Sequence, residues 1–270
     1  MQTNVSLPDE LLRELVAELN DEQTTAFALD GSYARGEANE YSDVDIICFR
    51  DDIPEGEELP LGFQYHANRL ISVHRVAIAT AHAGMYKPEN AVWWVPSLRN
   101  YRILLDKRGE LAALMQEARD FRWEPLQPAA DEYASTKLWA LSEQAHKLMG
   151  GLARHDAGIL YNSTINLLRS NTWSVVVQRG IMLKSQNSRI QQVEENVGLN
   201  SAWTRYHRLA MGIDEAATAL PPLEARAWAA LQLHLETIAL LRPIVRAAHL
   251  PVIEATAAKV RAAIKHESSR

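Results

Sequence analysis

The first part of the chain alternates between hydrophobic spacings typical of helices and short hydrophobic runs typical of strands. From Leu11 to Leu19, apolar side chains recur every three or four residues, which predicts an amphipathic helix that starts near Pro8. Short apolar and β-branched runs then predict strands, two of which read as a hairpin. We predict strands over 24–29, 43–49, 61–66, 70–78 and 102–105, and further helices over 89–95 and 109–121.

The pattern changes after Pro125 and Pro128, because strand signals mostly stop there and helical periodicity takes over. The first long helix is predicted over 131–149 and is expected to end at Gly150-Gly151. We therefore predict an α+β protein, with an N-terminal α/β domain that has a mixed sheet and an all-α helical-bundle domain after it. The predicted domains span 1–125 and 126–270, and the remaining predicted helices span 152–182, 191–197, 202–211, 223–248 and 252–264.

The distribution of charge changes at the same place. Residues 1–125 carry 12 basic and 22 acidic side chains, whereas residues 126–270 carry 16 basic and 12 acidic side chains. The formal net charge of −6 is thus the balance of an acidic first part and a slightly basic second part. Such an asymmetry supports two different domains. The overall acidity also argues against a nucleic-acid partner, because proteins that bind nucleic acids are usually basic.

Composition excludes several classes of protein. Hydrophobic residues make up 47% of the chain and charged residues 23%, which excludes a disordered chain. The single cysteine, Cys48, excludes a disulfide scaffold. No stretch reaches the apolar length of a membrane helix, and the segment from Met1 to Glu18 has no signal-peptide pattern. We therefore expect a cytoplasmic protein without a membrane partner, in which Cys48 is a buried strand residue.

One motif in the first domain has the residue types of a phosphate- and metal-binding site. Gly31 follows the first predicted strand, and Ser32 stands where its hydroxyl and the N–H groups of a helix start could hold a phosphate. Arg35, one helical turn further, can add positive charge or brace the loop. Asp43 and Asp45 are two residues apart on the second strand, so both carboxylates point to one face. Paired carboxylates beside such a turn can hold Mg²⁺ bridged to a nucleoside triphosphate.

Each half of this motif has an ordinary explanation when it stands alone. A Gly-Ser pair is usually only a turn, and Asp-x-Asp is usually a solvated strand end. The order strand, Gly-Ser, helix, Asp-x-Asp, strand favours a catalytic site. On Gly31-Ser32, Arg35-Gly36 and Ser42-Asp43-Val44-Asp45, the chain resembles the DNA polymerase beta-like nucleotidyltransferase superfamily.

This resemblance implies transfer of a nucleoside monophosphate from a nucleoside triphosphate to a hydroxyl group, with release of pyrophosphate. Two Mg²⁺ ions normally serve in the family, one to activate the acceptor and one to hold the triphosphate. Asp43 and Asp45 would then be catalytic and ligate Mg²⁺, whereas Gly31, Ser32 and Arg35 would contact the nucleotide, for which we expect ATP.

The helical second domain narrows the resemblance. The chain is too short and too poor in basic patches to look like a template-directed polymerase. An α/β domain joined to a helical domain looks like the aminoglycoside nucleotidyltransferases of the kanamycin type. That likeness implies a small hydroxylated acceptor, such as an aminoglycoside-like antibiotic, and a homodimer is plausible.

A Glu-x-x-x-Lys pair in the first long helix of the second domain adds to this likeness. Glu143 and Lys147 are four residues apart, which puts both side chains on one helix face. By the resemblance, Glu143 would be the general base that takes the acceptor proton, and Lys147 would contact the triphosphate. The ordinary explanation is an exposed ion pair, which is common and contributes only about 0.3–0.5 kcal/mol.

The sequence departs from the family at the third carboxylate, which a later strand usually supplies. The candidate strand contains no acid, and Ser72 occupies the position that the pattern assigns to it. His74 shares a face with Ser72 and is the nearby residue able to bind metal or a proton. A partly exposed strand histidine is the plainer interpretation of His74.

Three functions therefore stay open. The first is a transferase that modifies a small hydroxylated molecule. The second is a nucleotidyltransferase that acts on protein or RNA. The third is a degenerate protein that binds nucleotide without turnover, which the absent third acid would explain.

Overall fold

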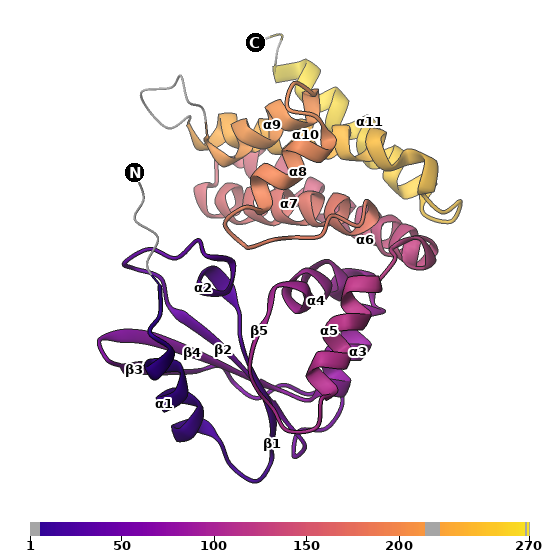
Figure 1. The fold of residues 1–270 in the computed structure, drawn as a ribbon. Helices are drawn as coiled ribbons and strands as arrows, with labels where there is room; N and C mark the ends of the chain where they lie inside the picture. The colour runs from indigo at the N-terminus through magenta and orange to yellow at the C-terminus, as the bar shows by residue number, and fades with distance from the viewer. Residues whose placement is uncertain (1–5, 214–221, 268, 270) are drawn as a thin grey trace. The chain divides into compact units, whose positions relative to one another are not determined.

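The structure is a computed structural model that describes residues 6–213, 222–267 and 269 (Figure 1). The contacts between residues divide the chain into two compact units. The first unit consists of residues up to 123 together with 182–186, and the second consists of 124–181 and residues from 187 onward. The segment 182–186 joins the first unit through a hydrogen bond from the Leu183 N–H to the Val92 carbonyl, 2.9 Å long. The segment from Met1 to Glu18, which has no signal-peptide pattern, includes residues 1–5, and these five lie outside the described residues.

The first unit is built on a five-stranded sheet with the strand order β3-β4-β2-β1-β5. Neighbouring strands β2 and β4 are parallel, and the other three pairs are antiparallel, so the sheet is mixed as predicted. The strands are β1 (Thr24–Leu29), β2 (Val44–Arg50), β3 (Gly62–His66), β4 (Arg69–Val76) and β5 (Arg102–Asp106). Ala67 and Asn68 form the two-residue turn between β3 and β4, with φ values of 46° and 60° that are typical of hairpins.

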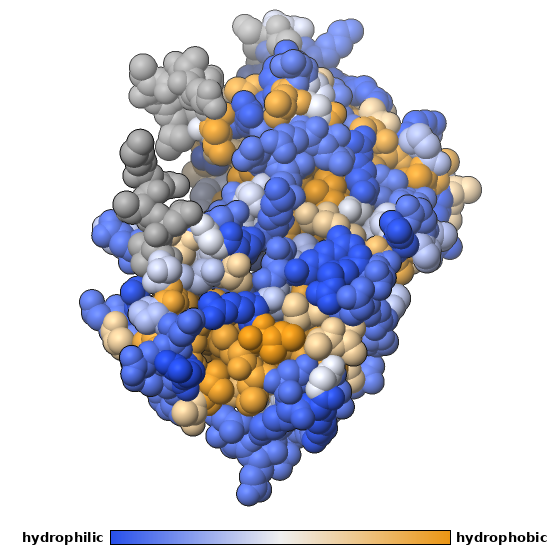
Figure 2. Space-filling model, in the orientation of Figure 1, coloured by the Kyte–Doolittle hydropathy of each residue, from blue (hydrophilic) through white to orange (hydrophobic). Residues whose placement is uncertain are grey.

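Helices cover both faces of this sheet (Figure 1). On one face lies α1 (Asp9–Leu19), whose Leu11, Leu12 and Leu15 pack with Ile46 of β2 in a buried cluster. The helices on the other face are α3 (Ile78–Met85), α4 (Pro88–Asn100) and α5 (Glu110–Asp120). Figure 2 shows an apolar patch between α1 and β5, where Leu12, Val16 and Ile103 line a shallow groove.

Helix α3 was not predicted, because its run of alanines has no distinct hydrophobic side. We expected a strand to continue to Ile78, but β4 ends at Val76. Gly84 of α3 lies against Trp94 of α4, and a Cβ there would come within 2.4 Å of the indole. The packing of α3 on α4, rather than a periodic pattern, therefore stabilises this helix.

The regular elements of the second unit are all helices in its described residues, as predicted. Its core joins apolar side chains of α6, α7, α10 and α11, for example Leu148, Leu167, Leu231 and Val260. In the described part of the chain, no helix combines the length and the apolar character that a bilayer crossing requires. The elements are η1 (Glu124–Leu126), α6 (Gln127–Arg154), α7 (Ala157–Gln178), α8 (Arg189–Val197), α9 (Ala202–Met211), α10 (Leu223–Leu241), η2 (Arg242–Ile244) and α11 (Leu250–Glu267).

The prediction that Gly150-Gly151 ends the first long helix was wrong. Helix α6 runs through both glycines to Arg154, and the left-handed residue that ends it is His155, with φ 52°. A Cβ on Gly151 would lie 2.8 Å from the Ile159 side chain of α7. Gly151 therefore permits the close approach of two helices, which is a tertiary role that helix-ending statistics do not detect. The predicted helix over 223–248 was also too long, since α10 ends at Leu241.

Acid is expected to destabilise the helical unit because of His234 in α10. This side chain is fully buried, its Nδ1–H donates to Asn171 Oδ1 at 3.1 Å, and its Nε2 has no hydrogen-bond partner among the described residues. Burial lowers the pKa of His234 to about 4. Since an unfolded histidine has a pKa near 6.5, the unfolded chain takes up the proton first as the pH falls. The stability is complete above that value, and about 3 kcal/mol is lost by pH 4.

Urea unfolding followed by circular dichroism at pH 7 and pH 4.5 measures this loss. The variant His234→Gln should lose less stability between the two pH values than the parent protein. The control is His155→Gln, because His155 is an exposed histidine of the same unit. Equal losses in the parent and in His234→Gln would contradict the assignment.

Candidate active site

Gly31 brings the start of α2 (Gly31–Arg35) against the second aspartate of the motif. Gly31 has φ +68°, and a Cβ at this position would lie 1.8 Å from Asp45 Oδ2. The adjacent Asp30 N–H donates to the Asp45 carbonyl at 2.9 Å. Two independent constraints, the left-handed backbone and the close approach, therefore require glycine here.

Asp43 and Asp45 share the face of β2 that turns away from α1. Asp43 immediately precedes β2 and Asp45 is its second residue, and both side chains are half-buried. The residues between and after them, Val44 and Ile46, pack into the apolar cluster on the α1 side. Because side chains alternate along a strand, this packing fixes both carboxylates on the opposite face.

The carboxyl of Asp45 is held in an environment that disfavours its charge. Its pKa is raised to about 7, first by burial and then by repulsion from Asp43 and Asp30. Arg35 acts in the other direction and lowers the pKa of Asp45. A cation placed among these carboxylates would offset the repulsion between them. Perturbed carboxyl groups of this kind are typical of functional sites.

Asp30 is a site residue that the sequence reasoning did not find. It precedes Gly31 and follows β1, all six residues of which are buried. Burial raises the pKa of Asp30, whereas the nearby Gly31 N–H, the charge of Arg35 and the Ser97 side chain lower it. The available signal was an acidic residue directly after the apolar run Ala26–Leu29, at the end of the strand that leads into the Gly31 turn.

Ser72 lies beside Asp45 in the sheet, and His74 does not. Strands β2 and β4 pair in parallel with Asp45 opposite Ser72 and Ile47 opposite His74. Ser72 is 6% exposed, so a hydroxyl occupies the position next to the aspartate. The His74 Nε2 lies 3.1 Å from Glu58 Oε2, and its ring stacks on Trp94. These contacts support the plainer interpretation of His74 as a partly exposed strand histidine.

The two carboxylates of Asp43 and Asp45 suit a metal ion whose other ligands are water and substrate. No group of three or more His, Cys, Asp or Glu side chains in the described ranges is arranged to hold a metal ion. Mg²⁺ is commonly bound through one or two carboxylates, with water and substrate phosphates completing its octahedron. Asp43 and Asp45 offer hard oxygen ligands of this type, and the residues present therefore fit Mg²⁺ together with a phosphate.

The remaining predicted nucleotide contacts of the first unit lie in and around α2. Ser32 is in the first turn, and its carbonyl accepts from the Glu37 N–H at 2.9 Å. Arg35 closes the helix, with its Nε 2.8 Å from Glu37 Oε2 and its side chain mostly buried. Arg35 therefore faces both the site carboxylates, whose pKa it lowers, and an exposed glutamate.

Glu143 and Lys147 belong to α6 of the second unit. Lys147 Nζ lies 2.6 Å from Glu143 Oε1, and both side chains are exposed. This hydrogen bond with Lys147 lowers the pKa of Glu143. The structure thus brings the two residues together as the i,i+4 spacing predicts, and their role in a reaction stays a prediction.

Comparison with known proteins shows what this chain is similar to. Residues 10–90 match the family model of the nucleotidyltransferase domain. The comparison with curated protein sequences found no match. A crystal structure of a nucleotidyltransferase-like protein from Exiguobacterium sibiricum shares the fold, with a TM-score of 0.50 and 15% sequence identity. That similarity covers 87% of this chain and 74% of the other.

The matched segment contains the features described above: β1, the Gly31 turn, the Asp43–Asp45 pair and the parallel strand that carries Ser72. The resemblance to the polymerase beta-like superfamily is confirmed, while similarity to the kanamycin-type enzymes in particular stays a prediction. Residues 10–90 of this chain are therefore similar to the nucleotidyltransferase domain, and the similarity to the solved structure concerns the fold.

Proposed function

We propose that this protein transfers a nucleoside monophosphate from a nucleoside triphosphate to a hydroxyl of a small molecule and releases pyrophosphate. The observation that carries the proposal is the Asp43–Asp45 pair at the start of β2, with the Asp45 carboxylate lying against Gly31, which has no Cβ. The nucleotidyltransferase domain supports transfer of this general kind.

In this mechanism, Asp43 and Asp45 would hold Mg²⁺, and the repulsion between their carboxylates would favour its binding. Bound Mg²⁺ would neutralise phosphate charge and lower the pKa of the acceptor hydroxyl. The Ser32 hydroxyl and the first N–H groups of α2 would hold triphosphate oxygens beside it. Arg35 positions the turn and adds positive charge next to the carboxylates. Glu143 would take the acceptor proton, and Lys147 would contact the triphosphate.

The acceptor class follows from charge and from the family likeness. The acidic first part of the chain suits a neutral or cationic molecule better than a nucleic acid. An aminoglycoside-like antibiotic is therefore the first acceptor class to test, with ATP as the first nucleotide. A homodimer belongs to the same proposal.

A pyrophosphate-release assay tests the transfer. The protein is incubated with ATP, GTP, CTP or UTP, with Mg²⁺ or Mn²⁺, and with a panel of aminoglycosides and other polyols. At least one pair should release pyrophosphate in proportion to the modified acceptor measured by mass spectrometry. Background release with every pair would contradict the small-molecule acceptor, and nucleotides found on coexpressed protein or tRNA would point to the second class of acceptor.

Ser72 favours one further candidate, a protein that binds nucleotide without turnover. A hydroxyl stands beside Asp45 where the family usually has a third carboxylate. A missing ligand should weaken the metal that activates the acceptor more than the metal that holds the triphosphate. Calorimetry that detects binding of the Mg²⁺ nucleotide, combined with no turnover for any acceptor, would support this candidate.

The proposed base can be tested by Glu143→Gln once an acceptor is found. The variant keeps the size of the side chain and removes its basicity, so kcat should fall by about a hundredfold or more. Glu254→Gln is the matched control, because Glu254 is also an exposed carboxylate in an ion pair of the helical unit. The rise of kcat with pH on the acidic side of the parent enzyme's profile reports deprotonation of a general base, so it should be lost in Glu143→Gln and should persist in Glu254→Gln. Equal activity of both variants would show that Glu143 and Lys147 form an ordinary surface pair.

A further inference from the structure

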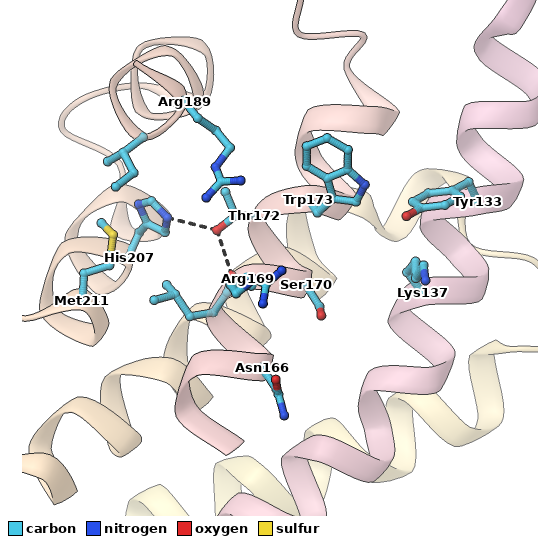
Figure 3. A pocket seen from close by; sticks show the side chains of 12 residues that line it. Tyr133, Lys137, Asn166, Arg169, Ser170, Thr172, Trp173, Arg189, His207 and Met211 are labelled. Carbon is cyan, nitrogen blue, oxygen red and sulfur yellow. Dashed lines mark hydrogen bonds between the residues drawn. The ribbon is translucent and has the colours of Figure 1, made fainter. Parts of the chain in front are cut away.

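The helical unit contains a pocket of about 340 Å³ that uses none of the residues of the candidate active site. Side chains of α6, α7, α8 and α9 line it, as Figure 3 shows. Its volume lies in the range of pockets that bind small molecules, which is roughly 300–1,000 Å³. All four helices belong to the second unit, so this unit alone forms the pocket.

Three cationic side chains line this pocket: Lys137 of α6, Arg169 of α7 and Arg189 of α8. No aspartate or glutamate is among the lining residues, and none of the ion pairs found within the described ranges involves these three cations. The Nζ of Lys137 lies 5.3 Å from the centroid of the Tyr133 ring, a cation–π contact that adds no negative charge to the pocket. The chain as a whole is acidic, so a pocket lined by three cations and no acid attracts an anion.

A buried hydrogen-bond network fixes the floor of the pocket. The Thr172 hydroxyl lies 3.0 Å from His207 Nε2, and His207 Nδ1 lies 2.9 Å from Glu194 Oε1 (Figure 3 shows the first contact). The second oxygen of Glu194 accepts from Arg208 Nε at 2.8 Å. Glu194 is 2% exposed and His207 is 1% exposed, and the indole of Trp203 stacks on the imidazole.

This network has two consequences for the pocket. Both oxygens of Glu194 are occupied by His207 and Arg208, so this carboxylate does not neutralise the lining cations. The network also ties α8 to α7 and α9, and α8 begins with Arg189. Arg189 is therefore held by a rigid element, and in Figure 3 its guanidinium points toward Thr172. A preorganised guanidinium binds a phosphate with two parallel hydrogen bonds at a smaller entropic cost.

Flat and polar side chains complete the lining. Tyr133 and Trp173 provide aromatic surface, while Asn166, Ser170 and Thr172 provide an amide and two hydroxyls. Aromatic walls suit a planar ring, and amide and hydroxyl groups suit the oxygens of a sugar or a phosphate.

We propose that this pocket binds a phosphate monoester carried on a flat ring system, of the class of the nucleoside monophosphates. Lys137, Arg169 and Arg189 hold the phosphate, and Tyr133 and Trp173 line the ring. The site does not depend on the proposed transfer, because it contains neither Asp43 nor Asp45.

Isothermal titration calorimetry on the 270-residue chain in EDTA tests the proposal, since EDTA removes the divalent cation that the proposed active site requires. The probe is adenosine 5′-monophosphate. Adenosine and inorganic phosphate, which are the two parts of this molecule, are titrated separately for comparison. We expect the monophosphate to bind at least about tenfold more tightly than either half, because charge and ring contribute together. Its affinity should fall as NaCl is raised from 50 to about 500 mM.

Substitutions distinguish binding in this pocket from binding in the candidate active site. The double variant Arg169→Gln, Arg189→Gln should bind adenosine 5′-monophosphate at least about tenfold more weakly than the parent protein. Lys259→Gln, which removes an exposed lysine of α11, should leave the affinity unchanged, as should Asp43→Asn with Asp45→Asn. Circular dichroism and thermal unfolding confirm that each variant is folded. The proposal is overturned if the monophosphate does not bind, if the double arginine variant binds it as the parent does, or if the aspartate variant abolishes binding.

Discussion

Asp45→Asn is expected to lower nucleotidyl transfer by about a thousandfold or more, because an amide is a poor ligand for Mg²⁺ and the reaction depends on charge neutralisation at the phosphate. The same change should not harm folding. Burial and the neighbouring Asp43 and Asp30 raise the pKa of Asp45 to about 7, so its charge costs the folded state free energy at neutral pH. Removal of this charge should therefore leave the melting temperature of the metal-free protein unchanged or higher.

The measurement is kcat/KM for the best nucleotide and acceptor pair, with thermal unfolding in EDTA beside it. The folded-state pKa of Asp45 lies above the unfolded value near 3.9, so the destabilisation grows as the pH rises from about 4 to 7. Asp51→Asn is the matched control, because Asp51 is an exposed aspartate of the same unit that pairs with Arg108. Transfer by Asp45→Asn within tenfold of the parent would refute the assigned role.

Gly31→Ala should have the second-largest effect, and Gly36→Ala is its control. The two glycines have nearly the same backbone conformation, with φ +68° and +70°. Alanine in this conformation costs roughly 1–2 kcal/mol at either position. The surroundings differ, since a Cβ on Gly31 would meet Asp45 Oδ2 at 1.8 Å and a Cβ on Gly36 has nothing within 4 Å. Only Gly31→Ala must therefore displace the Asp45 carboxylate.

We expect kcat/KM to fall by about a hundredfold or more in Gly31→Ala and by less than about threefold in Gly36→Ala, because catalytic groups must be held within a fraction of an ångström. Both variants should lose a few degrees of melting temperature. If the two variants lose activity equally, backbone strain alone explains the loss. The close approach of Gly31 to Asp45 would then not be required for activity.

The sequence predicted those features of the candidate site that depend on a single short segment. The order of Gly31, Ser32, Asp43 and Asp45 along the chain predicted a strand–turn–helix–strand unit, and β1, α2 and β2 form it. Spacing of two placed both aspartates on one face because strand side chains alternate. The roles of these residues in transfer stay predictions, as do those of Glu143 and Lys147.

Features that depend on contacts between residues far apart in the sequence could not be predicted from it. The pattern did not show that Asp30 joins the charged cluster, because its neighbours Asp45 and Arg35 reach it only in the folded sheet. Gly151 looked like a helix end, yet it is the contact point of α6 with Ile159. The pocket of Lys137, Arg169 and Arg189 likewise draws its three charges from three helices.

The sequence by itself thus determined the class of fold, the Gly31 turn and the aspartate pair, because backbone conformation and side-chain alternation act over a few residues. Tertiary structure decided that Ser72 rather than His74 lies beside Asp45, since strand register is set by the pairing of β2 with β4. It also decided the raised pKa of Asp45, because burial and repulsion depend on which groups the fold brings within a few ångströms.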